Sequence, residues 1–186
     1  MKPAAPGTRK LRLATTSLAG CFGCHMSFLD IDTRLLDLLE HVELDCSPLT
    51  DIKVPHPDCD IGLIEGAVCN AENVHVLRTF RARCKLLLAV GACAVTGGLP
   101  AQRNQLALPI LLETVYHTAP GLVNGRIPND PELPLLLDRV YPLHEVVHID
   151  YWIPGCPPSA DTLWAVLSDL LAGRTPRLAA GQVQYD

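Results

Sequence analysis

Short apolar runs alternate along this chain of 186 residues with longer stretches in which apolar residues recur at helical spacing. One run, KLLLAV at residues 85–90, is continuously apolar over the length of a strand, which is typical of a strand buried on both faces of a sheet. We predict strands at residues 11–16, 42–46, 60–65, 85–90 and 145–149. The intervening periodicity predicts helices at residues 28–39, 73–83, 110–118 and 161–171.

This alternation predicts an α/β fold, in which a doubly wound parallel sheet carries helices on both faces. No linker or repeat divides the chain, so we expect a single domain over residues 1–186. Residues 1–9 are expected to be flexible. Residues 99–144 are rich in proline and long for a connection, and they carry many apolar side chains. We interpret them as an insertion that faces a partner protein.

Composition narrows the class of protein. The formal net charge is −5 and the basic residues are scattered, which argues against nucleic acid as a partner. The longest apolar run, residues 86–95, is about half as long as the roughly 20 residues of a membrane helix. The first ten residues show no secretory signal, so we expect a cytoplasmic protein without direct membrane insertion. In a reducing compartment, the eight cysteines indicate metal or redox chemistry rather than disulfides.

Four of these cysteines come just after predicted strands. Cys21 and Cys24 follow the first strand in SLAGCFGC, Cys93 follows the fourth in GACAVTGG, and Cys156 follows the last in PGCPP. The carboxyl ends of parallel strands lie at one edge of a sheet, so we expect these thiols to converge there. The glycines beside them allow sharp turns and close approach of the backbone to a bulky group.

Three kinds of site could use these thiols. Structural zinc usually joins two CxxC pairs in a small domain, whereas this chain has one such pair. A thioredoxin-like dithiol needs no help from distant cysteines. A 4Fe–4S cluster takes four thiolates and accepts them from separated segments. We favour the cluster, and zinc and dithiol chemistry stay open as alternatives.

The remaining cysteines are weaker candidates. Cys69, in EGAVCN, is the serious rival ligand because it comes near the same edge of the predicted sheet. Cys46, Cys59 and Cys84 are expected to be small apolar core residues, which is the usual role of a free cysteine.

Other polar and aromatic residues near the expected site allow more than one interpretation. Glu65 ends the third strand, either as a solvated or capping side chain or as a buried acceptor of backbone N–H groups near Cys21, with a proton relay as a further role. His25 is expected to be a structural or interface histidine. Trp152 is expected to pack over the cluster or a partner. The loop at residues 15–20 has the composition of a phosphate loop, but the cysteines occupy it, so we expect no flavin in this chain.

The motifs CFGC, IEGAV, GACAVTGG and PGCPPSADTL, in this order, resemble the small subunit of nickel–iron hydrogenases over roughly residues 10–172. The framework is also similar to the subunit of respiratory complex I that carries its last cluster. That subunit has adjacent cysteines in its first motif, whereas Phe22 and Gly23 separate the pair here. This spacing of the two cysteines favours the resemblance to the hydrogenase small subunit over that to the complex I subunit.

This resemblance implies a flavodoxin-like fold and one proximal 4Fe–4S cluster held by Cys21, Cys24, Cys93 and Cys156. It places the nickel–iron centre, and therefore catalysis, in a large partner subunit. The chain has neither Cys nor His after Cys156, which resembles the short small subunit of soluble NAD(P)-linked hydrogenases. There a diaphorase with flavin and further clusters takes the electrons. We therefore expect an electron-transfer subunit, with a complex-I-like or other membrane-associated hydrogenase, or a zinc-stabilised interaction subunit, as alternatives.

Overall fold

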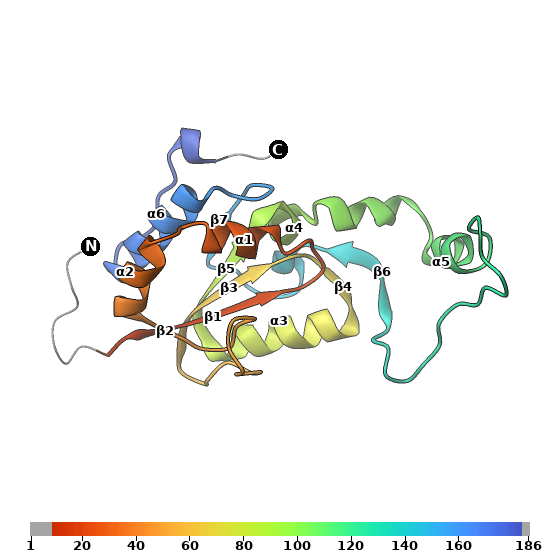
Figure 1. Ribbon diagram of the computed structural model, residues 1–186, viewed down its shortest axis with the longest axis horizontal. Helices are drawn as coiled ribbons and strands as arrows, with labels where there is room; N and C mark the ends of the chain where they lie inside the picture. Colours follow the sequence, from red (N-terminus) through yellow and green to blue (C-terminus); the bar gives the residue numbers. More distant parts are fainter. Residues whose placement is uncertain (1–8, 184–186) are drawn as a thin grey trace.

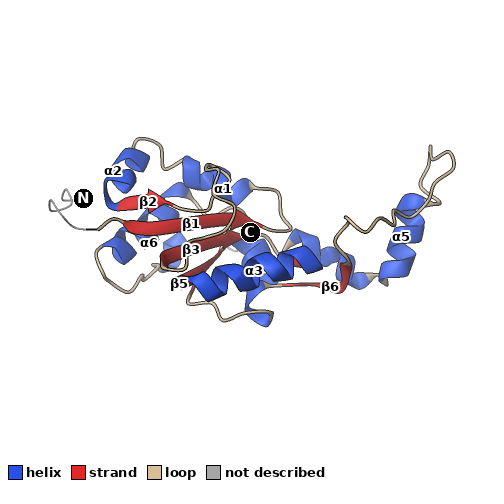
Figure 2. Ribbon diagram, turned by 90° about the horizontal axis from the view of Figure 1, so that it is seen from below, coloured by secondary structure: helices blue, strands red, loops and turns tan. Residues whose placement is uncertain are grey.

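The computed structural model describes residues 9–183, in which a parallel sheet lies between two layers of helices (Figures 1 and 2). The stretch expected to be flexible, residues 1–9, lies outside the described residues except for Arg9. The strands of the main sheet are β1 (Leu11–Ser17), β2 (Val42–Leu44), β3 (Cys59–Glu65), β5 (Cys84–Val90) and β7 (Tyr151–Ile153). The helices are α1 (Gly23–Leu29), α2 (Arg34–His41), α3 (Ala71–Arg83), α4 (Gly91–Thr96), α5 (Leu108–Tyr116) and α6 (Ala160–Leu171), with 3₁₀ turns η1 (Leu99–Gln105), η2 (Leu143–Glu145) and η3 (Ala180–Gln182).

The order of the strands confirms the flavodoxin-like prediction. The main sheet runs β2-β1-β3-β5-β7 with all neighbours parallel, which is the order 2-1-3-4-5 when its five strands are counted along the chain. The strand order reverses at β1 and β3. In this fold, ligands bind beyond the carboxyl ends of the strands at that switch point.

Two apolar cores hold the layers together. On one face, Phe28 of α1, Leu38 of α2 and Leu163 of α6 pack on the sheet, and on the other face Leu77 of α3 does the same. Both cores take side chains from β3, which is buried over its whole length. The sheet is therefore a rigid platform, and its loops are positioned by buried strands on both sides.

Two predicted elements were wrong. Residues 145–149 do not form a strand, because the N–H groups of Val146 and Val147 both donate to the Leu143 carbonyl and turn the chain. Their apolar character comes from burial under the sheet, where Ile149 joins the core. The edge strand β7 begins only after Asp150, whose N–H donates to the Leu87 carbonyl. The helix predicted at residues 28–39 is broken into α1 and α2.

Much of the stretch of residues 99–144 projects from the body of the molecule, whereas Leu143 at its end belongs to the core on the α3 face. The strands β4 (Val68–Asn70) and β6 (Leu136–Tyr141) form a separate antiparallel pair, and α5 lies beyond it at the end of the molecule (Figures 1 and 2). The arrowheads of β1 and β3 point toward the side on which this projection lies (Figure 1). Within residues 9–183, we find no helix with the length and apolarity to cross a bilayer.

Candidate metal-cluster site

The four predicted cysteines meet at the carboxyl edge of the sheet. Cys21 follows β1, Cys24 lies in the first turn of α1, Cys93 in α4 directly after β5, and Cys156 in the loop after β7. All four line one cavity of about 60 Å³, together with Glu65 at the end of β3. Cys21 and Cys156 are exposed, and Cys24 and Cys93 are partly buried. The fold therefore gathers four thiols from three separate segments at the carboxyl edge of the sheet.

Two glycines make room for these thiols. Gly91 has a φ of +85°, and a Cβ added to it would overlap the Sγ of Cys24. Gly98 has a φ of +47°, and a Cβ there would lie 3.0 Å from the Sγ of Cys93. Both positions combine a left-handed backbone with a sulfur at close range, which only glycine accommodates without displacement.

Hydrogen bonds tie the cysteine-bearing loops to one another. The Ala92 N–H donates to the Gly155 carbonyl at 2.7 Å, which links α4 to the PGCPP loop. The hydroxyl of Ser27 donates to the Pro158 carbonyl at 2.5 Å, which links α1 to the same loop. Ser27 and Pro158 are 131 residues apart, so no local sequence signal could reveal this contact. The loops are thus held in place by the protein itself.

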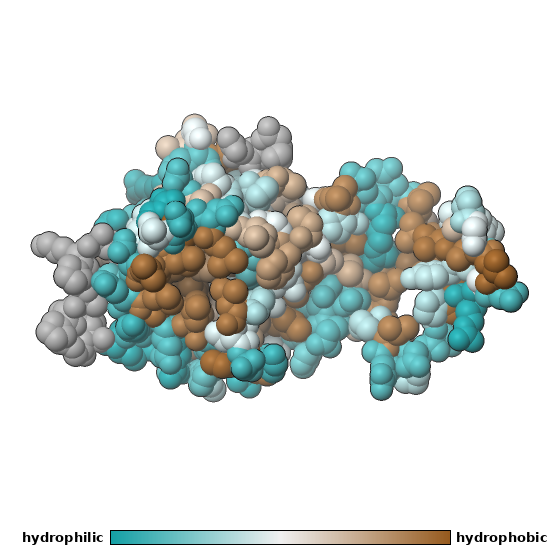
Figure 3. Space-filling view, in the orientation of Figure 1, coloured by the Kyte–Doolittle hydropathy of each residue, from teal (hydrophilic) through white to brown (hydrophobic). Residues whose placement is uncertain are grey.

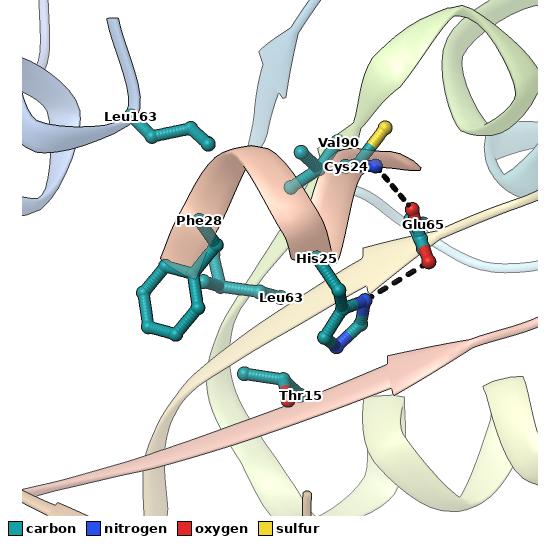
Figure 4. Close-up of a pocket in the computed structure, with 8 residues that line it drawn as sticks. All are labelled: Thr15, Cys24, His25, Phe28, Leu63, Glu65, Val90 and Leu163. Carbon is teal, nitrogen blue, oxygen red and sulfur yellow. Dashed lines mark hydrogen bonds and ion pairs between the residues drawn. The ribbon is translucent and has the colours of Figure 1, made fainter. Parts of the chain in front are cut away.

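Glu65 is the buried acceptor at this edge, and the solvated interpretation is wrong. Its side chain is 4% exposed. One carboxylate oxygen accepts the Cys24 N–H at 2.9 Å, and the other lies 3.0 Å from Nδ1 of His25 (Figure 4). Burial alone would raise the pKa of Glu65, but hydrogen bonds from His25, Ser17 and Cys24 outweigh it and lower that pKa. The carboxylate therefore stays ionised behind the cysteines.

Two of the thiols titrate above the usual range. Burial, followed by the neighbouring Glu65 carboxylate, raises the pKa of the Cys24 thiol far above its usual value. Burial also raises the pKa of Cys93, with smaller contributions from Cys156 and Cys21. Cys24 and Cys93 would hold a metal centre as thiolates, so they would give up these protons when such a centre binds.

The donor set fits a group bound by thiolates. Four thiols from separated segments suit a 4Fe–4S cluster, which takes four cysteine thiolates. A tetrahedral zinc ion can also take four thiolates.

The other cysteines lie away from this cavity. Cys69 is in β4, where its thiol donates to Oδ1 of Asn73 at 3.3 Å, and it does not line the cavity. Cys46, Cys59 and Cys84 are buried in the core on the α3 face, as predicted.

Trp152 and the loop at residues 15–20 also have defined places. Trp152 is 46% exposed on the edge strand β7 and is not among the residues that line the cavity. In the loop, the N–H groups of Leu18 and Ala19 donate to the carbonyls of Glu65 and Ala67. These two donors are therefore committed to the protein and are not free to bind a phosphate.

The family model for the 20 kDa subunit of NADH ubiquinone oxidoreductase matches residues 21–170, which include every cysteine of the site. The chain belongs to this family. It is 47% identical, over its whole length and 91% of the relative, to the delta subunit of the NAD-reducing hydrogenase HoxS from Cupriavidus necator. It is 39% identical over 91% of its length to a subunit of the F420-non-reducing hydrogenase from Methanococcus voltae, and it spans 59% of that relative.

Solved structures agree with the family assignment. A crystal structure of an NAD⁺-reducing [NiFe]-hydrogenase in the H₂-reduced state contains a chain that matches with a TM-score of 0.93 and 59% identity, covering 96% of this chain and 100% of that one. The Ni–Fe–Se hydrogenase from Desulfomicrobium baculatum matches with a TM-score of 0.55 at 20% identity, which shows a shared fold. The predicted relationship to nickel–iron hydrogenase small subunits is confirmed.

Proposed function

We propose that this chain is the electron-transfer small subunit of an NAD(P)-linked nickel–iron hydrogenase. Cys21, Cys24, Cys93 and Cys156 would hold one 4Fe–4S cluster, which accepts and donates single electrons when bound. The observation that carries the proposal is the convergence of these four thiols around one cavity at the carboxyl edge of the sheet. The likeness to the HoxS subunit over the whole chain supports the same function.

The position of the cavity suits a relay between two partners. Cys21 and Cys156 are exposed at the surface, so a partner protein can approach the site closely. In this proposal, the nickel–iron centre of a large subunit exchanges electrons with the cluster. A diaphorase with flavin and further clusters then exchanges them with NAD or NADP. The chain itself contributes no catalytic residue, and Glu65 remains a candidate for a proton relay.

The projection within residues 99–144 is the proposed docking surface for the large subunit. Apolar side chains are exposed along it, and the space-filling view shows hydrophobic surface gathered around α5 (Figure 3). Contiguous exposed apolar surface of this kind marks protein interfaces. It lies on the side toward which β1 and β3 point, so a protein covering the cysteine cavity would also meet it (Figure 1). The most exposed members include Leu99, Leu106, Ile110, Val123 and Leu135.

The test is purification of the chain with its partner proteins without air, followed by iron and sulfide analysis and EPR of the reduced protein. We expect about four irons per chain, as a 4Fe–4S cluster requires, and hydrogen-dependent reduction of NAD. The variant Cys93→Ser should lose the EPR signal. Cys69→Ser is the matched control, since Cys69 lies outside the cavity, and it should keep the signal.

Three other results would contradict the proposed function or the proposed ligands. Zinc without iron would refute electron transfer and leave a structural site. A cluster that disappears in Cys69→Ser but survives in Cys93→Ser would show that the ligand set is wrong. A cluster without hydrogen-dependent activity in the intact complex would favour a complex-I-like role.

A further inference from the structure

The contact between His25 and Glu65 lies directly behind the cysteine cavity. Glu65 joins the end of β3 to α1 by accepting the Cys24 N–H through one oxygen, and Nδ1 of His25 lies 3.0 Å from the other oxygen. A carboxylate can only accept, so Nδ1 carries the hydrogen of this bond. His25 therefore anchors the oxygen that Cys24 does not use, which fixes the orientation of the whole carboxylate.

The surroundings of His25 show that packing does not explain a histidine there. The residue is 6% exposed, and its neighbours around a small cavity include Phe28, Leu63 and Val90 (Figure 4). Its Nε2 has no hydrogen-bond partner among the described residues. An unpaired buried polar atom costs about 1–3 kcal/mol, a cost that an apolar side chain would avoid. The feature that an apolar side chain cannot supply is the hydrogen bond to Glu65.

The ring is also held in orientation by its neighbour in the CFGC motif. Phe22 stacks on His25 with ring centroids 4.5 Å apart and an interplanar angle of 10°. Phe22 does so from a left-handed backbone, with a φ of 67°. Such a conformation is unfavourable for a bulky residue and persists only where surrounding contacts enforce it. The CFGC motif thus supplies two thiols and, through Phe22, the support for the histidine that follows them.

We propose that His25 is a positioning residue, which holds the Glu65 carboxylate beside Cys24 so that its negative charge lowers the reduction potential of the centre held by the four cysteines. This inference rests on the proposed function. A fixed negative charge next to an anionic cluster disfavours the added electron, and hydrogen bonding and net charge are among the factors that set such potentials. The carboxylate also engages the Cys24 N–H, which is then not available to a sulfur atom.

The test is an EPR-monitored redox titration of the anaerobically purified complex. Glu65→Gln keeps the shape of the side chain and removes its charge, so the midpoint potential should rise. His25→Leu removes the hydrogen bond and should raise the midpoint in the same direction. His25→Asn places an amide N–H near the position of Nδ1, so it should return the midpoint toward the wild-type value. If both residues act as one unit, His25→Leu should add no further shift in the Glu65→Gln background.

The control is Thr15→Val, which changes the same small cavity but leaves the Glu65 contact in place, and its midpoint should equal the wild-type value. Iron content and EPR of the wild type are measured first, and their absence would refute the proposed function itself. With a cluster present, an unshifted Glu65→Gln would overturn the role of the charge. A shifted Glu65→Gln with an unshifted His25→Leu would overturn the role of His25. If His25→Leu does not assemble, a further midpoint shift on adding His25→Asn to Glu65→Gln would overturn the role of His25, because the two residues would then not act as one unit.

Discussion

Gly91→Ala tests whether the protein itself shapes the cysteine cavity. Gly91 starts α4 with a φ of +85°, and an added Cβ would overlap the Sγ of Cys24. The left-handed backbone costs an alanine roughly 1–2 kcal/mol. Relieving the overlap adds about 1–3 kcal/mol, the usual cost of overpacking a filled site. Together, the two effects should destabilise the protein by about 2–5 kcal/mol. The destabilisation should act mainly on the contact with Cys24.

The assay measures how readily the cysteine site opens, not how stable the whole protein is to unfolding. A cost of about 2 kcal/mol increases the population of an opened site roughly thirtyfold. In the anaerobic complex, a ferrous chelator should therefore extract iron from Gly91→Ala at least about tenfold faster than from the wild type. The visible absorbance of the centre reports the loss directly.

Gly173→Ala is the matched control for the backbone alone. Gly173 has a φ of +68° at the end of α6, and nothing lies within 4 Å of the Cβ that alanine would add. This variant should lose about 1 kcal/mol of unfolding free energy and release iron at the wild-type rate. Equal extraction rates for Gly91→Ala and Gly173→Ala would refute the claim that Gly91 makes room for Cys24.

Two further predictions concern Asp60, near the amino end of β3, and the projection within residues 99–144. Burial raises the pKa of Asp60, but hydrogen bonds from Lys85, the Arg12 N–H and Arg9 outweigh it and lower that pKa. The ionised form therefore stabilises the fold above the unfolded pKa of about 4 and loses this effect as pH falls through the folded value. Asp60→Asn should cost about 2 kcal/mol in urea unfolding at pH 7, and the difference should shrink below pH 4; a constant difference would contradict this. On the projection, Leu135→Glu should reduce recovery of the large subunit with the chain, whereas Leu36→Glu, at another exposed leucine on α2, should not.

Periodicity was enough to predict most of the sheet, and the position of four cysteines after predicted strands was enough to predict that they lie together at one edge. The central strands β3 and β5 are largely apolar runs that are buried along most of their length, and the cysteines come after strands of the main sheet. The run EVVHI was wrongly predicted to be a strand, because burial under the sheet makes a turn as hydrophobic as a strand. The turn became visible only through hydrogen bonds to Leu143.

The contacts that hold the site together were not predictable from sequence, because they join segments far apart in the chain. The bond from Ser27 to Pro158 spans 131 positions, and the Glu65 contact to His25 spans 40. Taken alone, Ser27 and His25 are an ordinary serine and an ordinary histidine on a helix.

The structure also shows that Phe22 in the CFGC motif does more than separate the two cysteines. By its spacing alone, CFGC offers two thiols, with Phe22 and Gly23 as separators. Phe22 instead supports His25, His25 anchors Glu65, and Glu65 binds the Cys24 N–H, so the chain of contacts returns to the second thiol. The same short segment thus supplies two thiols and the support of the histidine behind them. A substitution at Phe22 that preserved both cysteines should therefore still alter the site.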